Sequence, residues 1–99
     1  MKKIEEIEQI LRDNKWELKK RYNVNQIGMF GSYVRGENQK KSDLDILVDF
    51  DDDAKIGLLR FINLENYLSD LLRIKVDLVM RSSLKPKIGK HILEEVVYL

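Results

Sequence analysis

The chain has 99 residues, 43% hydrophobic and 35% charged, a composition that predicts one compact, well-solvated domain over residues 1–99. Eighteen basic and seventeen acidic residues leave a net charge of +1, so we expect no direct nucleic-acid binding and no attraction to anionic membranes. The absence of cysteine excludes disulfides and thiolate metal sites. An N-terminus that turns acidic after two lysines does not fit a signal peptide, and no apolar run reaches transmembrane length. These features predict a cytoplasmic protein.

The first half of the chain predicts a helix followed by two strands. Isoleucine and leucine recur at helical spacing among charges over residues 2–21, which indicates an amphipathic helix. A short strand over residues 25–30 stops at Gly31-Ser32, and a short helix is predicted through Tyr33, Val34 and Arg35. A polar loop then leads to a second strand over residues 43–50. Alternation in this strand puts Leu44, Ile46 and Val48 on one face, with Asp43, Asp45 and Leu47 on the other.

The second half predicts a helix, a strand and a last helix. The helix covers residues 56–73, and the strand over residues 74–80 alternates Val76 and Leu78 against Asp77 and Val79. Ser82-Ser83 is predicted to cap a final helix that runs past Pro86 and includes Val96 and Val97. The order α-β-β-α-β-α predicts a small α/β (α+β) domain, in which helices pack on a short sheet.

Three aspartates form the first candidate site. Asp43 and Asp45 are two apart in a strand, so their Cα atoms lie about 6.5 Å apart on one face. Asp77 shares that face if the two strands are neighbours. Two-metal phosphoryl-transfer sites hold their ions about 3.5–4 Å apart. Oxygen ligands without nearby histidine or cysteine favour a hard ion, Mg²⁺ or Mn²⁺. The alternative is that aspartates decorate a solvated strand face, although mutual repulsion argues against it.

The glycine-serine turn forms the second candidate site. A strand that ends in Gly31-Ser32 before a short helix exposes backbone N–H groups, which together with the serine hydroxyl suit phosphate oxygens. The alternative is an ordinary tight turn with Ser32 as a helix cap. Arg35 either reaches a phosphate or forms a salt bridge that fixes the loop. His91 is the only histidine, and we expect it to be structural or superficial and far from this motif.

Gly31-Ser32-Tyr33-Val34-Arg35-Gly36 followed by Ser42-Asp43-Leu44-Asp45-Ile46 resembles the signature of the DNA polymerase β-like nucleotidyltransferase superfamily. The short chain and the Arg-Gly segment look like the minimal nucleotidyltransferases of prokaryotes. Such proteins are commonly antitoxins paired with a helical HEPN-domain toxin. The resemblance runs from the first helix through Asp77, and it implies the polymerase β-like fold, with helices packed on a small mixed sheet.

The resemblance also implies roles for individual residues. Asp43 and Asp45 would ligate two Mg²⁺ ions, or Mn²⁺ in their place. Asp77 would bind one of these ions and help to deprotonate the attacking hydroxyl. Gly31 and Ser32, with Arg35, would hold the triphosphate of ATP or another nucleoside triphosphate. In proteins that look like this one, the acceptor hydroxyl can be a tyrosine of the partner toxin.

The leading hypothesis is therefore a metal-dependent enzyme that transfers AMP from ATP to a HEPN toxin and acts as its antitoxin. One alternative is a nucleotidyltransferase subunit that modifies a small molecule or a nucleic acid. Another is a catalytically silent module that only binds the toxin. The apolar C-terminal residues 96–99 either pack into the domain or contribute to a homo- or hetero-oligomer.

Overall fold

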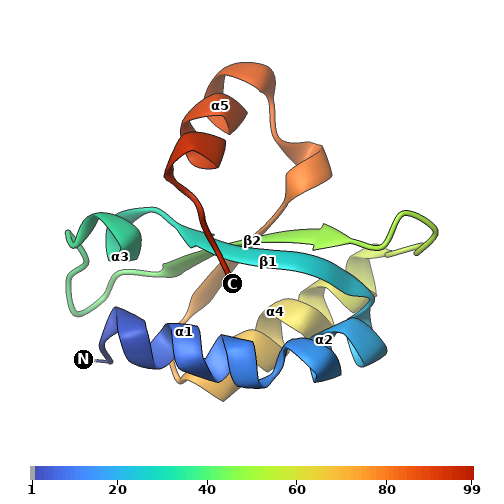
Figure 1. Ribbon diagram of the computed structural model, residues 1–99, viewed down its shortest axis with the longest axis horizontal. Coiled ribbons are helices and arrows are strands. Elements are labelled where there is room, and N and C mark those ends of the chain that lie inside the picture. Colours follow the sequence, from blue (N-terminus) through green and yellow to red (C-terminus); the bar gives the residue numbers. More distant parts are fainter. Residues whose placement is uncertain (1) are drawn as a thin grey trace.

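The computed structural model describes residues 2–99 and contains a four-stranded mixed sheet (Figure 1). The strands are β1 (Val24–Phe30), β2 (Leu44–Phe50), β3 (Val76–Met80) and β4 (Val97–Tyr98), arranged in the order β3-β2-β1-β4. β2 and β3 are parallel neighbours, while β1 runs antiparallel to β2 and to β4. The predicted α+β class and mixed sheet are confirmed.

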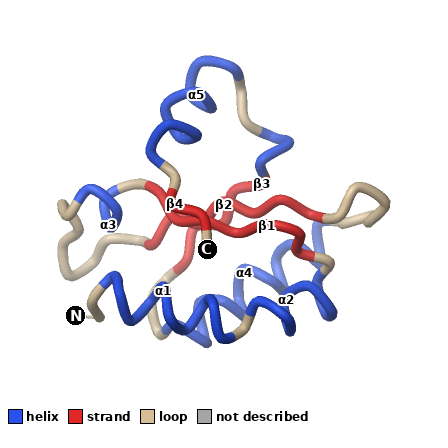
Figure 2. Tube along the Cα trace, in the orientation of Figure 1, coloured by secondary structure: helices blue, strands red, loops and turns tan. Residues whose placement is uncertain are grey.

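Helices cover the two faces of the sheet unequally (Figures 1 and 2). α1 (Ile4–Asp13), α2 (Lys15–Tyr22) and α4 (Leu58–Leu72) lie on one face, and α5 (Pro86–Glu95) lies on the other. The main apolar core fills the space beneath the three helices, with buried side chains that include Ile7, Leu18, Met29, Leu44, Ile46, Val48, Leu64, Leu68 and Leu78. Within residues 2–99, no helix combines the length and apolar character that a membrane span requires.

The predicted alternation of β2 and β3 is confirmed by burial. Leu44, Ile46 and Val48 have no exposed surface and belong to the main core, as Val76 and Leu78 do. The intervening residues of both strands must therefore face α5. The fold thus leaves the aspartates of both strands on the less covered face of the sheet.

The predicted N-terminal helix is two helices, because the chain breaks at Asn14. Its backbone leaves helical geometry at φ −105° and ψ 7°, and its side-chain amide donates a 2.7 Å hydrogen bond to the carbonyl of Ile10. Asparagine side chains compete in this way with the regular helical ladder. Hydrophobic spacing alone did not reveal the break, since apolar residues continue on both sides of it.

The prediction for the last helix was wrong at both ends. Ser82 and Ser83 belong to a short 3-10 turn, η1 (Arg81–Ser83), and α5 begins only at Pro86. α5 ends at Glu95, and Val97 pairs with Met29 of β1 instead of continuing the helix. β-Branched valines favour extended backbone, which explains why this segment adds a strand to the free edge of β1.

Candidate active site

The three predicted aspartates share one end and one face of the sheet. Asp45 of β2 and Asp77 of β3 are partners in the parallel register, so their Cα atoms lie roughly 4.8 Å apart. Asp43 comes immediately before β2 and, two residues from Asp45, lies on the same face. The three aspartates therefore lie on one face of the sheet, and β2 and β3 are neighbours, as predicted. Their role as metal ligands stays a prediction.

Electrostatic coupling supports this convergence. The pKa of Asp45 rises from 3.8 to about 6, first because burial disfavours the charged carboxylate and then because Asp77 and Asp43 repel a further negative charge. Arg35 acts in the opposite direction. A half-buried carboxylate beside two others is a place where a cation would be strongly stabilised.

The donor set fits a hard divalent ion. All three candidate ligands are carboxylates, and oxygen ligands suit Mg²⁺ and Mn²⁺. Among residues 2–99, no three acidic or histidine side chains are already gathered closely enough to hold one ion. The fit therefore rests on donor chemistry, a shared face and mutual repulsion.

Gly31 lies against Asp45. A Cβ atom added at Gly31 would overlap the Asp45 carboxylate. The backbone of Gly31 has φ +80° and ψ −155°, a conformation that is found almost only at glycine. It precedes α3 (Ser32–Arg35), and its carbonyl accepts hydrogen bonds from the N–H groups of Val34 and Arg35. Glycine at this position thus allows β1 to turn into α3 directly over the carboxylate.

Glu95, at the end of α5, ties this turn to the last helix. The Gly31 N–H donates a 2.7 Å hydrogen bond to Oε2 of Glu95, and Nη1 of Arg35 lies 2.7 Å from Oε1. The Arg35 hydrogen bond, followed by that of Gly31, lowers the pKa of Glu95. The hydrogen bonds that Arg35 donates to Glu95 and then to Glu37 raise the pKa of Arg35. Arg35 therefore forms a salt bridge, one of the two roles predicted for it. The Glu95 carboxylate also accepts the hydrogen bond of the Gly31 N–H, a donor that was predicted to bind phosphate.

Sequence reasoning did not select Glu95, although a signal was present. Ile92 and Glu95 are three residues apart and lie on the same side of α5, and both are partly buried. A partly buried carboxylate beside an apolar side chain needs a hydrogen-bond or ion-pair partner. That partner, the turn at Gly31, became evident only from the fold.

A pocket of about 530 Å³ lies between α5 and the turn after β1. Gly31, Arg35, Asp45 and Glu95 form its polar lining, while the remaining lining residues are Phe30, Ile88, His91 and Ile92. His91 is exposed but lies beside the motif, so the expectation that it would be remote was wrong. His91 is far from Gly31 in the sequence, but α5 folds back over the sheet and brings the two residues to one pocket. The pocket combines polar and apolar lining, and its volume lies in the range of small-molecule sites.

Ser32 is the first residue of α3 and is partly buried. Its carbonyl accepts a 2.9 Å hydrogen bond from the N–H of Glu37, which closes the short helix. The predicted contact of its hydroxyl with phosphate stays a prediction.

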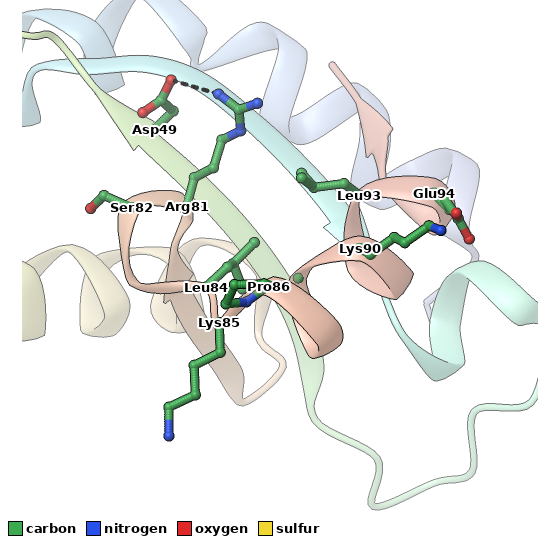
Figure 3. Close-up of a pocket in the computed structure, with 10 residues that line it drawn as sticks. Asp49, Arg81, Ser82, Leu84, Lys85, Pro86, Lys90, Leu93 and Glu94 are labelled. Atoms are coloured by element: carbon green, nitrogen blue, oxygen red, sulfur yellow. Dashed lines mark ion pairs between the residues drawn. The ribbon is translucent and has the colours of Figure 1, made fainter.

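A separate pocket of about 630 Å³ lies between η1, α5 and the end of β2 (Figure 3). Figure 3 shows Arg81 reaching toward Asp49, with which it forms an ion pair of 3.9 Å. Among the residues that the structure describes, none of the six predicted site residues lines this pocket. It is therefore distinct from the candidate active site.

Carboxylates on neighbouring strands, next to a glycine turn and a pocket, fit an enzyme that acts on phosphate esters. Residues 4–99 match the model of the family described as "Nucleotidyltransferase domain". The chain therefore belongs to this family and is a nucleotidyltransferase.

The proteins that are most usefully compared with this chain support the same family assignment. The protein adenylyltransferase MntA of Thermococcus cleftensis is 57% identical over 96 residues, which make up 97% of this chain and 95% of the relative. A presumed minimal nucleotidyltransferase of known structure superposes with a TM-score of 0.74 at 32% identity, covering 94% of this chain and 95% of that chain. A crystal structure of a toxin–antitoxin with AMP-PNP gives a TM-score of 0.68 at 26% identity, covering 95% of this chain and 69% of the other.

Proposed function

We propose that this nucleotidyltransferase transfers AMP from ATP to a hydroxyl of a partner protein, a tyrosine of a HEPN toxin, and thereby acts as an antitoxin. The observation that carries the chemistry is the pairing of Asp45 with Asp77 directly beside Gly31. The relative named protein adenylyltransferase, at 57% identity over nearly the full chain, supports a protein acceptor and AMP as the group transferred. The similar toxin–antitoxin with AMP-PNP supports the biological context and the nucleotide.

Each group of the site has a task in this reaction. The acceptor oxygen attacks the α-phosphorus of ATP, the bond from that phosphorus to the bridging oxygen breaks, and pyrophosphate leaves with the electron pair. Asp77 takes up the proton of the acceptor hydroxyl. Asp43 and Asp45 would hold Mg²⁺ or Mn²⁺, which supplies positive charge to the phosphates and orients the two reacting oxygens.

The pocket beneath α5 would bind the nucleotide. Arg35 and the N–H groups around Gly31 and Ser32 suit the triphosphate, while Ile88 and Ile92 offer apolar surface to the nucleoside. Because Glu95 already accepts hydrogen bonds from Gly31 and Arg35, the phosphates must displace it or share these donors with it.

Asp45→Asn tests the assignment directly. The amide keeps the size of the side chain but removes the charge that would hold the cation, so we expect the fold to persist and transfer to cease. Wild type and variant are each incubated with ATP, Mg²⁺ and a HEPN toxin as acceptor, and intact mass reports added AMP. Asp70→Asn, at an exposed position of α4, is the matched control and should retain transfer. Normal transfer by Asp45→Asn would overturn the proposal.

A further inference from the structure

A second pocket, of about 670 Å³, adjoins the acidic site and is strongly basic. Asp43 contributes to its lining together with five cationic side chains from three separate segments, namely Lys2, Lys40, Lys41, Arg73 and Lys75. Five positive charges against one negative charge are a marked local excess in a chain whose net charge is +1. The segments meet because the loop before β2 and the loop before β3 lie at the same end of the parallel pair.

These five cations are not used to hold the fold together. Elsewhere, Lys19, Arg35 and Arg81 each form an ion pair with a carboxylate. Within residues 2–99, the five side chains that line this pocket take part in no ion pair or side-chain hydrogen bond. Arg73 in addition occupies the left-handed position after α4, at φ +56°, where glycine is the usual residue. Unpaired like charges facing one pocket repel each other, and an anion between them would remove that repulsion.

The two pockets lie at different members of the aspartate group. Asp45 lines the pocket that contains Gly31 and Arg35, whereas Asp43 lines the basic pocket. In phosphoryl transfer the attacking and leaving oxygens are roughly in line, on opposite sides of the phosphorus. If the triphosphate occupies the pocket at Gly31, the basic pocket adjoins the side from which the acceptor approaches.

We propose that the basic pocket binds phosphate anions on the acceptor side, in particular the phosphodiester that transfer of AMP creates on the acceptor. This inference rests on the proposed function. A product held there keeps its ribose hydroxyl near the aspartates, so it can serve as the next acceptor. That hydroxyl oxygen then attacks the α-phosphorus of a second ATP, its proton passes to Asp77, and pyrophosphate leaves with the electrons of the broken bond.

The test uses the full chain and the dinucleotide pApA, which carries the phosphodiester without a protein acceptor. Lys40→Ala/Lys41→Ala removes two pocket cations, and Lys15→Ala/Lys87→Ala removes two exposed lysines outside the pocket. We expect the pocket variant to bind pApA about tenfold more weakly, since two charge-assisted contacts are lost, and the control to bind normally. Binding by the wild type should weaken with salt. Lys40→Arg/Lys41→Arg should restore affinity.

Kinetics distinguish the acceptor phosphate from the triphosphate of ATP. In the pocket variant we expect an unchanged KM for ATP, intact first transfer and loss of any second AMP in the mass spectrum of the acceptor. Equal pApA affinity in both double variants would overturn the site, as would a raised KM for ATP with unchanged pApA binding. Wild-type enzyme that binds pApA through these lysines but transfers no AMP would refute the proposed function and leave the phosphate site standing.

Discussion

At the scale of one residue, the backbone conformation of Gly31 and the position of the candidate catalytic Asp45 depend on each other. Its backbone conformation is almost reserved for glycine, and the Asp45 carboxylate fills the space that a methyl group would need. The sequence predicts that a phosphate contacts this glycine. The structure shows that a catalytic candidate already approaches it, so the glycine is required before any ligand binds.

Gly31→Ala should therefore damage both stability and activity. We expect a loss of about 1–3 kcal/mol in the free energy of unfolding, measured with urea, because alanine strains the turn. Transfer should fall in the remaining folded protein, since Asp45 must move. Gly57→Ala is the control, because a Cβ atom there meets open space. An alanine variant as stable and active as wild type would show that the turn tolerates a side chain.

The raised pKa of Asp45 predicts a pH-dependent stability of the metal-free protein. The folded state holds this proton up to about pH 6, whereas the ordinary value is 3.8, so the folded state is favoured at low pH and loses this advantage as pH rises through that window. We expect Asp45→Asn to gain thermal stability relative to wild type between pH 4 and 7 in chelator. Mg²⁺ should raise the Tm of wild type but not of the variant. A Tm difference that is constant with pH would contradict the shifted pKa.

At the scale of elements, α5 connects the glycine turn to the end of the chain described here. Glu95 lies at the junction between α5 and β4, and it accepts hydrogen bonds from Gly31 and Arg35. Glu95→Gln keeps an oxygen for the Gly31 N–H but removes the charge that attracts Arg35. We expect tighter ATP binding, by a few-fold, because Arg35 becomes free to meet the phosphates. Titration with ATP measures this, with Glu94→Gln as the control at an exposed neighbouring position. Weaker binding would mean that Glu95 positions Arg35 for the nucleotide.

Element prediction succeeded where periodicity and long-range pairing agreed. β2, β3 and α4 were located to within about two residues, because alternation and helical spacing there match the burial that the fold imposes. The break at Asn14 and the strand β4 were missed for a shared reason. A side-chain hydrogen bond decides the first, and an available sheet edge decides the second, and neither is visible in local hydrophobic patterning.

At the scale of the whole molecule, α4 offers a comparison between core and surface. Leu68 has no exposed surface, while Leu59 on the same helix is 73% exposed. Leu68→Ala should lower the free energy of unfolding by about 2–5 kcal/mol through the cavity it leaves. Leu59→Ala should change it by less than about 0.5 kcal/mol. Urea unfolding of the two variants measures both values. Equal losses would mean that α4 is not seated on the sheet as described.

The candidate site was predictable from the sequence to the extent that strand geometry determines it. Strand spacing gave the common face of Asp43 and Asp45 and selected Asp77 and the glycine turn as candidates, and the family resemblance supplied their roles. The partner of Glu95, the position of His91 and the basic pocket could not be anticipated, since they depend on how α5 and two distant loops return to the sheet. The residues contributed by one strand were predictable, and those brought by tertiary folding were not.

The parallel pairing of β2 with β3 makes the geometry of the aspartates depend on the crossover through α4. A slip of one residue in β3 would turn Asp77 to the opposite face, and a slip of two would carry it about 6.6 Å along the strand. Parallel strands so far apart in sequence associate late, once the intervening helix has docked. A chain still completing its fold should therefore lack affinity for divalent ions, and cation binding during refolding would report the moment at which this register is established.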